Sequence, residues 1–271
     1  MEIRVGTSGY QYQDWRGSFY PPDIEARQML AYYAQKFDVV ELNFTFYGVP
    51  RAKNIERMVR VTPPDFRFFV KANEATTHKL DRTVAPAFKE GIEPARAAGK
   101  LGGILAQFPW GFKNVAENRR YLSDLREDFA DYPLVVEFRH ASWIRPEVFG
   151  FLREHSLGFC CVDEPKIRGL LPPIAEATAE TAYIRFHSRD ASRWFGGDAK
   201  ERYNYLYSKE EMAEWLPRIR KLADEVSRIY VFFNNCHAGH AAVNATQFKE
   251  MLRELGMLGA AKGSGMASGA P

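Results

Sequence analysis

Short runs of β-branched and aromatic residues alternate eight times with longer segments of helical periodicity along this chain of 271 residues. Strands that alternate with helical patterns of about 10–15 residues are typical of βαβ units, in which the strands lie parallel. The predicted strands span residues 3–7, 39–46, 67–73, 102–108, 134–139, 158–163, 182–187 and 228–234. The predicted helices span residues 28–37, 53–61, 86–98, 118–129, 147–155, 210–226 and 241–255.

Eight such units, with apolar residues on both faces of the strands, favour a closed TIM-type (β/α)8 barrel over an open sheet. The length fits one barrel domain, for which about 250 residues is typical. We expect this single domain to span residues 1–258. Residues 164–180 are rich in Pro and Ala and are not expected to form a full helix. Residues 259–271 are rich in Gly, Ala and Ser, which predicts a disordered tail.

The charge and cysteine content predict a cytoplasmic protein without a membrane anchor. The net charge is only +3, so the basic surface typical of bulk nucleic-acid binding is not expected. Cys160 and Cys161 are adjacent and would point to opposite faces of a strand, which suits a reducing compartment better than a disulfide framework. The N-terminal MEIRVGTSGY reads as a strand rather than a signal peptide, and no run reaches about 18 apolar residues.

Polar residues gather at the carboxyl ends of the predicted strands, where barrel enzymes carry their active sites. Residues of a strand point alternately into and out of a barrel, so residues two apart share a face. This period pairs Glu41 with Asn43, Lys71 with Asn73, Glu137 with Arg139, and Arg185 with His187. The remaining strands end in Gln107, Asp163, and Asn234 followed by Asn235.

Six ionisable residues are therefore expected to converge on one end of the barrel, although charged groups are rarely buried unless paired. They are Glu41, Lys71, Glu137, Arg139, Asp163 and Arg185. Two interpretations remain open: a functional mouth, or a network of ion pairs that plugs the barrel. We favour the functional mouth, because desolvation makes buried ion pairs a weak source of stability.

The predicted catalytic residues are Glu41, Lys71, Glu137, Asp163 and His187. Glu137 or Glu41 would act as general base and His187 as acid, while Lys71, Arg139 and Arg185 would hold negative charge. The alternatives are plain ion pairs for the carboxylates, and for His187 a core histidine whose hydrogen bonds are satisfied.

A divalent metal is possible at this mouth but is not favoured. Glu41, Glu137, Asp163 and His187 offer suitable ligands, but three neighbouring cations would oppose the ion. The string Cys236-His237-Ala238-Gly239-His240 resembles half of a zinc site and has no second ligand pair nearby.

An anion site is better supported than a metal, because barrels often bind phosphate with the loops after strands seven and eight. Arg185, His187, Ser188, the pair Gly196-Gly197 and Gly239 lie in those parts of the chain. The glycines would let backbone N–H groups approach an anion, or they simply form turns.

A long polar and aromatic insertion, residues 189–208, follows the seventh strand. Long loops in compact domains are often lids or binding loops, but the insertion could equally be a surface excursion packed by its own aromatics.

Several sequence segments resemble a known family. They are GTSGYQYQDWRGSFYPP, VVELNFTFYGVP, FFVKAN, GGILAQFPWGF, VVEFRHASW, YIRFHS, RYNYLYSKEE and VFFNNCHAGHAAVNA, in this order. From about residue 3 to residue 255 the chain is similar to the YecE-like proteins of domain-of-unknown-function family 72. The resemblance implies a barrel related to the triose-phosphate isomerase type and supplies no reaction.

The polar positions that recur in that family overlap the predicted mouth. On this chain they fall on Ser8, Tyr10, Trp15, Glu41, Asn43, Tyr47, Lys71, Gln107, Glu137, Arg139, His140, Trp143, Asp163, Arg185, His187, Asn234 and Asn235. The chain departs from the family's usual His-Gly after strand seven, since it has His187-Ser188. A role that needs close backbone approach at Ser188 is therefore in doubt.

The residues expected to bind substrate are Ser8, Tyr10, Asn43, Tyr47, Gln107, Arg139, His140, Trp143, Arg185, Asn234 and Asn235. The aromatic residues Tyr10, Tyr47, Trp110, Trp143 and Trp194 could stack on a ring or a base.

The leading hypothesis is an enzyme that acts on a small anion, such as a phosphorylated sugar or nucleotide, by acid/base chemistry. The alternatives are a protein that binds or processes nucleic acid at the same mouth, and a ligand sensor without catalysis. The sequence predicts no particular cofactor or oligomeric state.

Overall fold

The computed structural model, which describes residues 1–195 and 199–259, is a closed barrel of eight parallel strands in sequential order. β1 pairs with both β2 and β8, which closes the sheet. The strands are β1 (Glu2–Ser8), β2 (Val39–Leu42), β3 (Arg67–Lys71), β4 (Leu101–Gln107), β5 (Leu134–Glu137), β6 (Leu157–Asp163), β7 (Thr181–Phe186) and β8 (Arg228–Phe233). The TIM-type barrel expected from the alternating pattern is confirmed.

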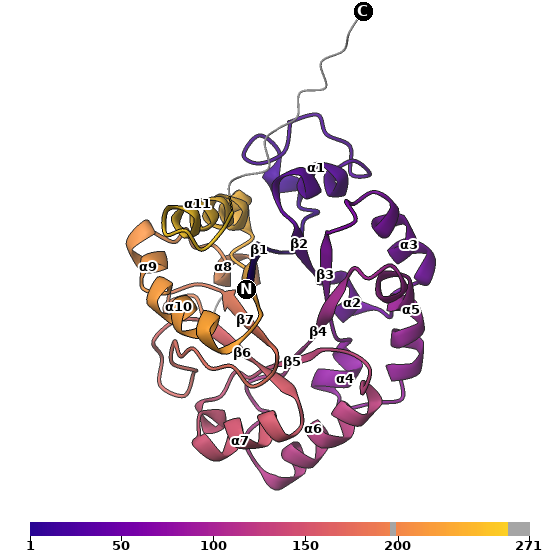
Figure 1. The fold of residues 1–271 in the computed structure, drawn as a ribbon, viewed down its shortest axis with the longest axis vertical. Helices are drawn as coiled ribbons and strands as arrows, with labels where there is room; N and C mark the ends of the chain where they lie inside the picture. Colours follow the sequence, from indigo (N-terminus) through magenta and orange to yellow (C-terminus); the bar gives the residue numbers. More distant parts are fainter. Residues whose placement is uncertain (196–198, 260–271) are drawn as a thin grey trace, which may run out of the picture.

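Helices form a ring outside the strands (Figure 1). They are α1 (Met29–Lys36), α2 (Phe44–Tyr47), α3 (Ala52–Arg60), α4 (Glu74–His78), α5 (Ala85–Ala97), α6 (Ala116–Asp128), α7 (Pro146–Glu154), α8 (Ala199–Arg202), α9 (Lys209–Ala213), α10 (Leu216–Glu225) and α11 (His240–Glu254). Three short 3-10 helices are η1 (Gln13–Trp15), η2 (Ala141–Trp143) and η3 (His237–Gly239). The apolar core lies between the strands and this ring, as expected for a sheet buried on both faces.

Aromatic side chains fill the interior of the barrel below the mouth. The ring of Phe69 lies 4.7 Å from those of Tyr183 and Tyr230, centroid to centroid. Glycine on β4 makes room for it, because a Cβ atom at Gly103 would lie 2.7 Å from the Phe69 ring. This layer of aromatic side chains lies directly below the polar residues of the mouth.

Two predicted strands end earlier than their sequences suggest. β2 ends at Leu42, and the aromatic residues of α2 turn away as a short helix. β3 ends at Lys71, because the Asn73 side chain accepts a hydrogen bond from the N–H of Ala75 and caps α4. At the end of β3 a local capping bond thus overrides the β propensity of the run.

The other departures from the expected elements are small. The helix expected over residues 210–226 is divided into α9 and α10, with Pro217 in the first turn of α10, where a missing N–H is tolerated. Residues 164–180 form no helix, as expected. Gly196, Gly197 and the tail from 260 to 271, which was predicted to be disordered, lie outside the described residues. No helix in the described part of the chain is long and apolar enough to span a membrane.

Candidate functional site

A cavity of about 630 Å³ opens at the carboxyl ends of the strands. It is lined by Gly9, Tyr10, Gln11, Tyr12, Asp14, Leu42, Asn43, Phe44, Phe46, Tyr47, Lys71, Gln107, Arg185, Arg202, Tyr203, Asn234, Cys236 and His237. Seven of the residues predicted from the sequence are among them: Tyr10, Asn43, Tyr47, Lys71, Gln107, Arg185 and Asn234. The mouth of the barrel is therefore hollow and open to small molecules.

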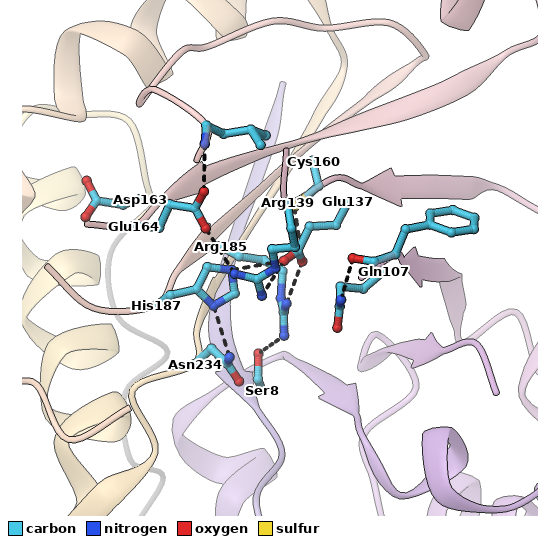
Figure 2. A network of polar contacts seen from close by, with 12 residues as sticks. Ser8, Gln107, Glu137, Arg139, Cys160, Asp163, Glu164, Arg185, His187 and Asn234 are labelled. Carbon is cyan, nitrogen blue, oxygen red and sulfur yellow. Dashed lines mark hydrogen bonds and ion pairs between the residues drawn. The ribbon is translucent and has the colours of Figure 1, made fainter. Parts of the chain in front are cut away.

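The floor of the cavity is a buried network of ion pairs centred on Arg185 (Figure 2). The Arg185 side chain comes from β7 and is almost fully buried. Its Nη2 lies 2.7 Å from Glu41 Oε1 and its Nη1 lies 2.5 Å from Glu137 Oε2. Nη2 also lies 3.3 Å from the hydroxyl oxygen of Ser8. Ser8 thus belongs to the floor and is not among the residues that line the cavity.

Each oxygen of the Glu137 carboxylate is occupied by a neighbouring donor. Arg185 approaches one oxygen, while Arg139 Nη2 at 2.6 Å and His187 Nε2 at 3.2 Å approach the other. Burial alone would raise the pKa of Glu137, but Arg139, Arg185 and His187 outweigh it and hold the pKa well below its usual range. Glu137 is therefore a permanent anion at neutral pH.

Glu41 is satisfied in the same way. Its second oxygen accepts a hydrogen bond of 2.6 Å from the hydroxyl of Tyr183, in addition to the ion pair with Arg185. The structure corrects the expectation that Glu41 or Glu137 acts as a general base. A base must reach the proton that it removes, whereas these two carboxylates lie in the floor and bind internal donors.

Arg139 connects Glu137 to a third carboxylate, that of Glu164. Arg139 Nη1 lies 3.0 Å from Glu164 Oε2, and Glu164 Oε1 accepts a hydrogen bond from the N–H of Leu171. Burial raises the pKa of Glu164 to about 7, although Arg139 and the Leu171 bond oppose the shift. Arg139 is held in the network and does not line the cavity, so the structure corrects its expected contact with substrate.

His187 has partners on both ring nitrogens. The Asn234 amide nitrogen lies 3.0 Å from Nδ1 and Glu137 Oε1 lies 3.2 Å from Nε2. An amide N–H donates, so Nδ1 accepts and Nε2 carries the proton. Burial and the charge of Arg139 lower the pKa of His187 to about 3. The structure corrects the expected general acid, because this histidine is neutral at pH 7 and orients Glu137.

Asp163 points away from the cavity, into the layer of helices outside the barrel. Its carboxylate accepts hydrogen bonds from the Tyr207 hydroxyl at 2.8 Å, Trp215 Nε1 at 2.7 Å and Arg189 at 2.7–2.9 Å. The opposite face of β6 carries Cys160, whose sulfur lies 3.8 Å from Glu137. The structure therefore corrects the catalytic role expected of Asp163, which anchors the segment after β7.

We predict that Asp163→Asn lowers the free energy of unfolding by about 2–3 kcal/mol, because the amide faces buried donors that need an acceptor. Urea denaturation measures the loss, and Glu214→Gln is the matched control. Glu214 pairs with the same Arg189 at 3.0 Å but is half exposed, so its replacement should change stability by less than about 1 kcal/mol. Equal losses in the two variants would contradict the anchoring role.

Three residues expected to bind substrate are structural. Trp143 is fully buried, stacks on Phe138 at 4.1 Å between centroids, and donates to the carbonyl of Phe112. Asn235 is buried and donates to the carbonyl of Tyr205. His140 accepts a hydrogen bond from the N–H of Ser142 and caps η2. The structure corrects all three expectations, since none of these side chains lines the cavity.

The insertion after β7 packs against the site. The ring of Trp194 lies 6.2 Å from that of His187, and the guanidinium of Arg139 lies over the same indole at 5.6 Å. Tyr203 lines the cavity, with its ring 6.0 Å from His187. Of these two aromatic residues, Tyr203 forms part of the cavity wall and Trp194 packs behind it. Trp194 is buried, and Trp110 lies against His140 outside the cavity.

Lys71 is an ionisable residue of the predicted set that faces the open cavity. Its Nζ lies 4.3 Å from the centroid of the Phe46 ring. Burial and the nearby charge of Arg185 lower the pKa of Lys71 to about 8. Among the described residues, no carboxylate lies within ion-pair distance of its ammonium group.

Other lining residues could not be read from the strand ends. Tyr12 and Asp14 belong to the loop after β1, Phe46 to α2, and Arg202 and Tyr203 to the insertion after β7. The segment GTSGYQYQDW carried a signal for the first loop, because its polar and aromatic residues follow a strand directly. Arg202 and Tyr203 come from a segment whose path the sequence does not specify.

The Cys-His-x-x-His string is part of the wall rather than a ligand cluster. The Cys236 thiol donates to the carbonyl of Ser8, and His237 and His240 face each other with centroids 5.8 Å apart. No three His, Cys, Asp or Glu residues of the described ranges are grouped to hold a metal ion. Gly239 has a φ of 84° and precedes α11, as the turn interpretation requires.

The comparisons with known proteins agree on one family. The family model described as "Protein of unknown function DUF72" matches residues 4–264. The chain is 32% identical to the UPF0759 protein YunF of Bacillus subtilis, over 92% of this chain and 94% of that protein.

Two crystal structures of DUF72 family proteins share the fold. The protein from Thermotoga maritima is 44% identical, with a TM-score of 0.87 over 93% of this chain and 100% of that one. The protein from Enterococcus faecalis is 29% identical, with a TM-score of 0.84 over 93% and 95%. The resemblance found in the sequence motifs is confirmed: the chain belongs to the DUF72 family of proteins of unknown function.

Proposed function

We propose that the cavity is the active site of an enzyme that acts on a small anionic molecule, such as a phosphorylated sugar or a nucleotide-like compound. The observation that carries this proposal is the imbalance of charge around the cavity. Glu41 and Glu137 are paired within the floor, while two cations at the cavity surface have no acidic partner among the described residues.

The two cations are Lys71 and Arg202, which come from opposite sides of the barrel. The third lining cation, Arg185, is already matched by Glu41 and Glu137. Among the described lining residues the one carboxylate is Asp14, whose oxygen accepts a hydrogen bond from the N–H of Ala238. An anion that enters the cavity therefore meets an excess of positive charge. The attraction between the anion and these cations is stronger than in bulk water, because the protein lowers the local dielectric constant.

The remaining lining groups suit a polar molecule that carries a ring or several hydroxyls. Asn43, Gln107 and Asn234 present amide groups, and Tyr10 and Tyr47 present aromatic surface. The side-chain oxygen Oδ1 of Asn43 is buried and has no hydrogen-bond partner within the described residues, so a ligand hydroxyl can donate to it. The volume of about 630 Å³ lies in the usual range for small-molecule sites.

Two features favour catalysis over simple binding. The cavity lies at the carboxyl ends of the strands, the face on which characterised barrel enzymes carry their active sites. It also contains a lysine whose pKa is lowered to about 8, within reach of neutral pH. The position of the cavity is common to barrel enzymes of many activities, whereas the lysine is specific to this site and therefore supports catalysis more directly.

We predict that isothermal calorimetry detects binding of ribose 5-phosphate, glucose 6-phosphate or inorganic pyrophosphate, and that Lys71→Gln and Arg202→Gln each weaken it about tenfold or more. A hydrogen bond to a charged group contributes roughly 1.5–3 kcal/mol, which sets this scale. Ribose and glucose, which lack the phosphate, should bind far more weakly.

Lys113→Gln is the matched control, because Lys113 also lies over an aromatic ring, that of Trp110, but outside the cavity. Its replacement should leave phosphate binding unchanged. Equal binding of sugars with and without phosphate would contradict the proposal. Binding of short oligo-dT in place of the small anions, weakened by the same substitutions, would favour nucleic acid as the ligand.

A further inference from the structure

Lys71 is held on a rigid support that points its side chain into the cavity. It is the last residue of β3, and β3 is hydrogen-bonded to β2 and β4. The hydroxyl of Thr45 donates a hydrogen bond of 2.6 Å to the carbonyl of Lys71 and fixes the backbone where the strand ends. A functional residue on a rigid strand is held in position more precisely than one on a loop.

The Lys71 side chain also contacts a ring whose helix is tied to the same strand end. Its ammonium lies over the Phe46 ring, and the Asn73 amide donates to the carbonyls of Thr45 and Phe46 at 3.1 and 3.2 Å. Asn73 therefore connects α2, which carries the ring, to the end of the strand that carries the lysine. These bonds hold the Phe46 ring in place beside the Lys71 ammonium.

The other two buried cations of the mouth differ from Lys71 in their contacts. Arg139 and Arg185 each bind two carboxylates, whereas in the described part of the chain Lys71 forms no ion pair or hydrogen bond through Nζ. A buried amine without a carboxylate partner loses its proton more readily than an exposed one. The charged and titratable groups around it are Arg185 on β7, Glu41 on β2, Glu137 and Arg139 on and after β5, and His78 on α4.

We propose that Lys71 is a nucleophile that forms an imine with the carbonyl carbon of a small anionic aldehyde or ketone bound in this cavity. This inference rests on the proposed function and narrows its substrate to carbonyl compounds. The position of Lys71, its contact with Phe46 and the lack of a carboxylate partner among the described residues carry it. Lysines in desolvated pockets form such adducts in many enzymes.

The step balances within the protein and the substrate. The Lys71 ammonium releases one proton to the cavity, and the nitrogen lone pair forms a bond to the carbonyl carbon while the C–O π bond opens. The carbinolamine oxygen takes up protons and leaves as water, and a C=N bond forms. Overall, one ammonium and one carbonyl give one protonated imine and one water, and no oxidant or reductant takes part.

Borohydride trapping tests this assignment. The protein is incubated at pH 7 with glyceraldehyde 3-phosphate or with pyruvate, reduced with sodium borohydride, digested and analysed by mass spectrometry. We expect the Lys71 peptide to gain the mass of the carbonyl compound less one oxygen atom. Its occupancy should exceed that of the Lys113 peptide at least tenfold. At pH 7 a lysine of pKa about 8 holds roughly 300-fold more neutral amine than an ordinary one.

Lys71→Arg separates this inference from the proposed function, because arginine keeps the positive charge but does not form the imine under these conditions. The variant should still bind inorganic pyrophosphate in the calorimeter and should lose the site-specific adduct. Lys113→Arg should keep both properties. Labelling spread evenly over surface lysines, together with normal pyrophosphate binding, would overturn the imine and leave the anion site intact. If the parent protein does not bind pyrophosphate, both the anion site and the imine at Lys71 are overturned.

Discussion

Replacing Arg185 by methionine is expected to lower the free energy of unfolding by about 3–5 kcal/mol, which is the largest effect of any single substitution at the mouth. The substitution leaves Glu41 and Glu137 buried without the cation that lies between them. Breaking a buried pair by removing one partner costs this much because the remaining charge is uncompensated. Urea denaturation at pH 7 measures the loss.

A compensated variant separates charge from packing. In Arg185→Met combined with Glu41→Gln and Glu137→Gln, the unpaired carboxylates are gone, and Arg139 keeps its contact with Glu164 at 3.0 Å. We expect this triple variant to recover more than half of the stability lost by the single one. A single variant that unfolds within about 1 kcal/mol of the parent protein would show that the floor carries no buried, uncompensated charge.

Replacing Lys71 by methionine is expected to have the opposite effect on stability, raising the free energy of unfolding at pH 7 by about 1–3 kcal/mol. The pKa of Lys71 is about 8 in the folded protein, against an ordinary value of 10.5. Below pH 8 the native state therefore holds a charge that its surroundings disfavour. Methionine has a similar shape and removes that cost, while binding of phosphate compounds falls as it does in Lys71→Gln.

The stability that Lys71→Met adds is expected to decrease as the pH rises. Between pH 8 and pH 10.5 the unfolded protein binds more protons at this residue than the native one, so the native state gains stability as the pH rises. The advantage of Lys71→Met is full below pH 8 and fades as the pH approaches 10.5. Urea denaturation at pH 7 and pH 9.5 should show the difference shrinking by about half. Lys113→Met, at an exposed position, should show no such trend.

The sequence predicts the barrel and the gathering of polar side chains at its mouth, because both follow from periodicity. The period of two correctly directs Glu41, Lys71, Glu137 and Arg185 toward the barrel interior. The same rule does not orient β6, because the residue two positions before Asp163 is Cys161, so no second charged side chain marks one face of this strand. Asp163 was therefore assigned to the mouth although it faces outward.

Chemical roles were less predictable than positions, because a role depends on which partners a side chain meets. His187 and Glu137 have suitable chemistry for proton transfer, yet each is saturated by residues about 50 positions away. Lys71 is distinguished by the lack of a carboxylate partner among the described residues, which no local pattern records. Arg202 and Tyr203 reach the cavity from a long insertion whose course depends on tertiary packing.

The ion pairs of the floor also bear on how fast the barrel opens. Glu41 and Arg185 are 144 positions apart, and they meet only when the first and second halves of the chain have come together. Before closure both groups are solvated, so their pairing adds little to the transition state of folding. Interactions that form after the transition state slow unfolding rather than speed folding. We therefore expect the network to slow unfolding and to lengthen the lifetime of the closed barrel.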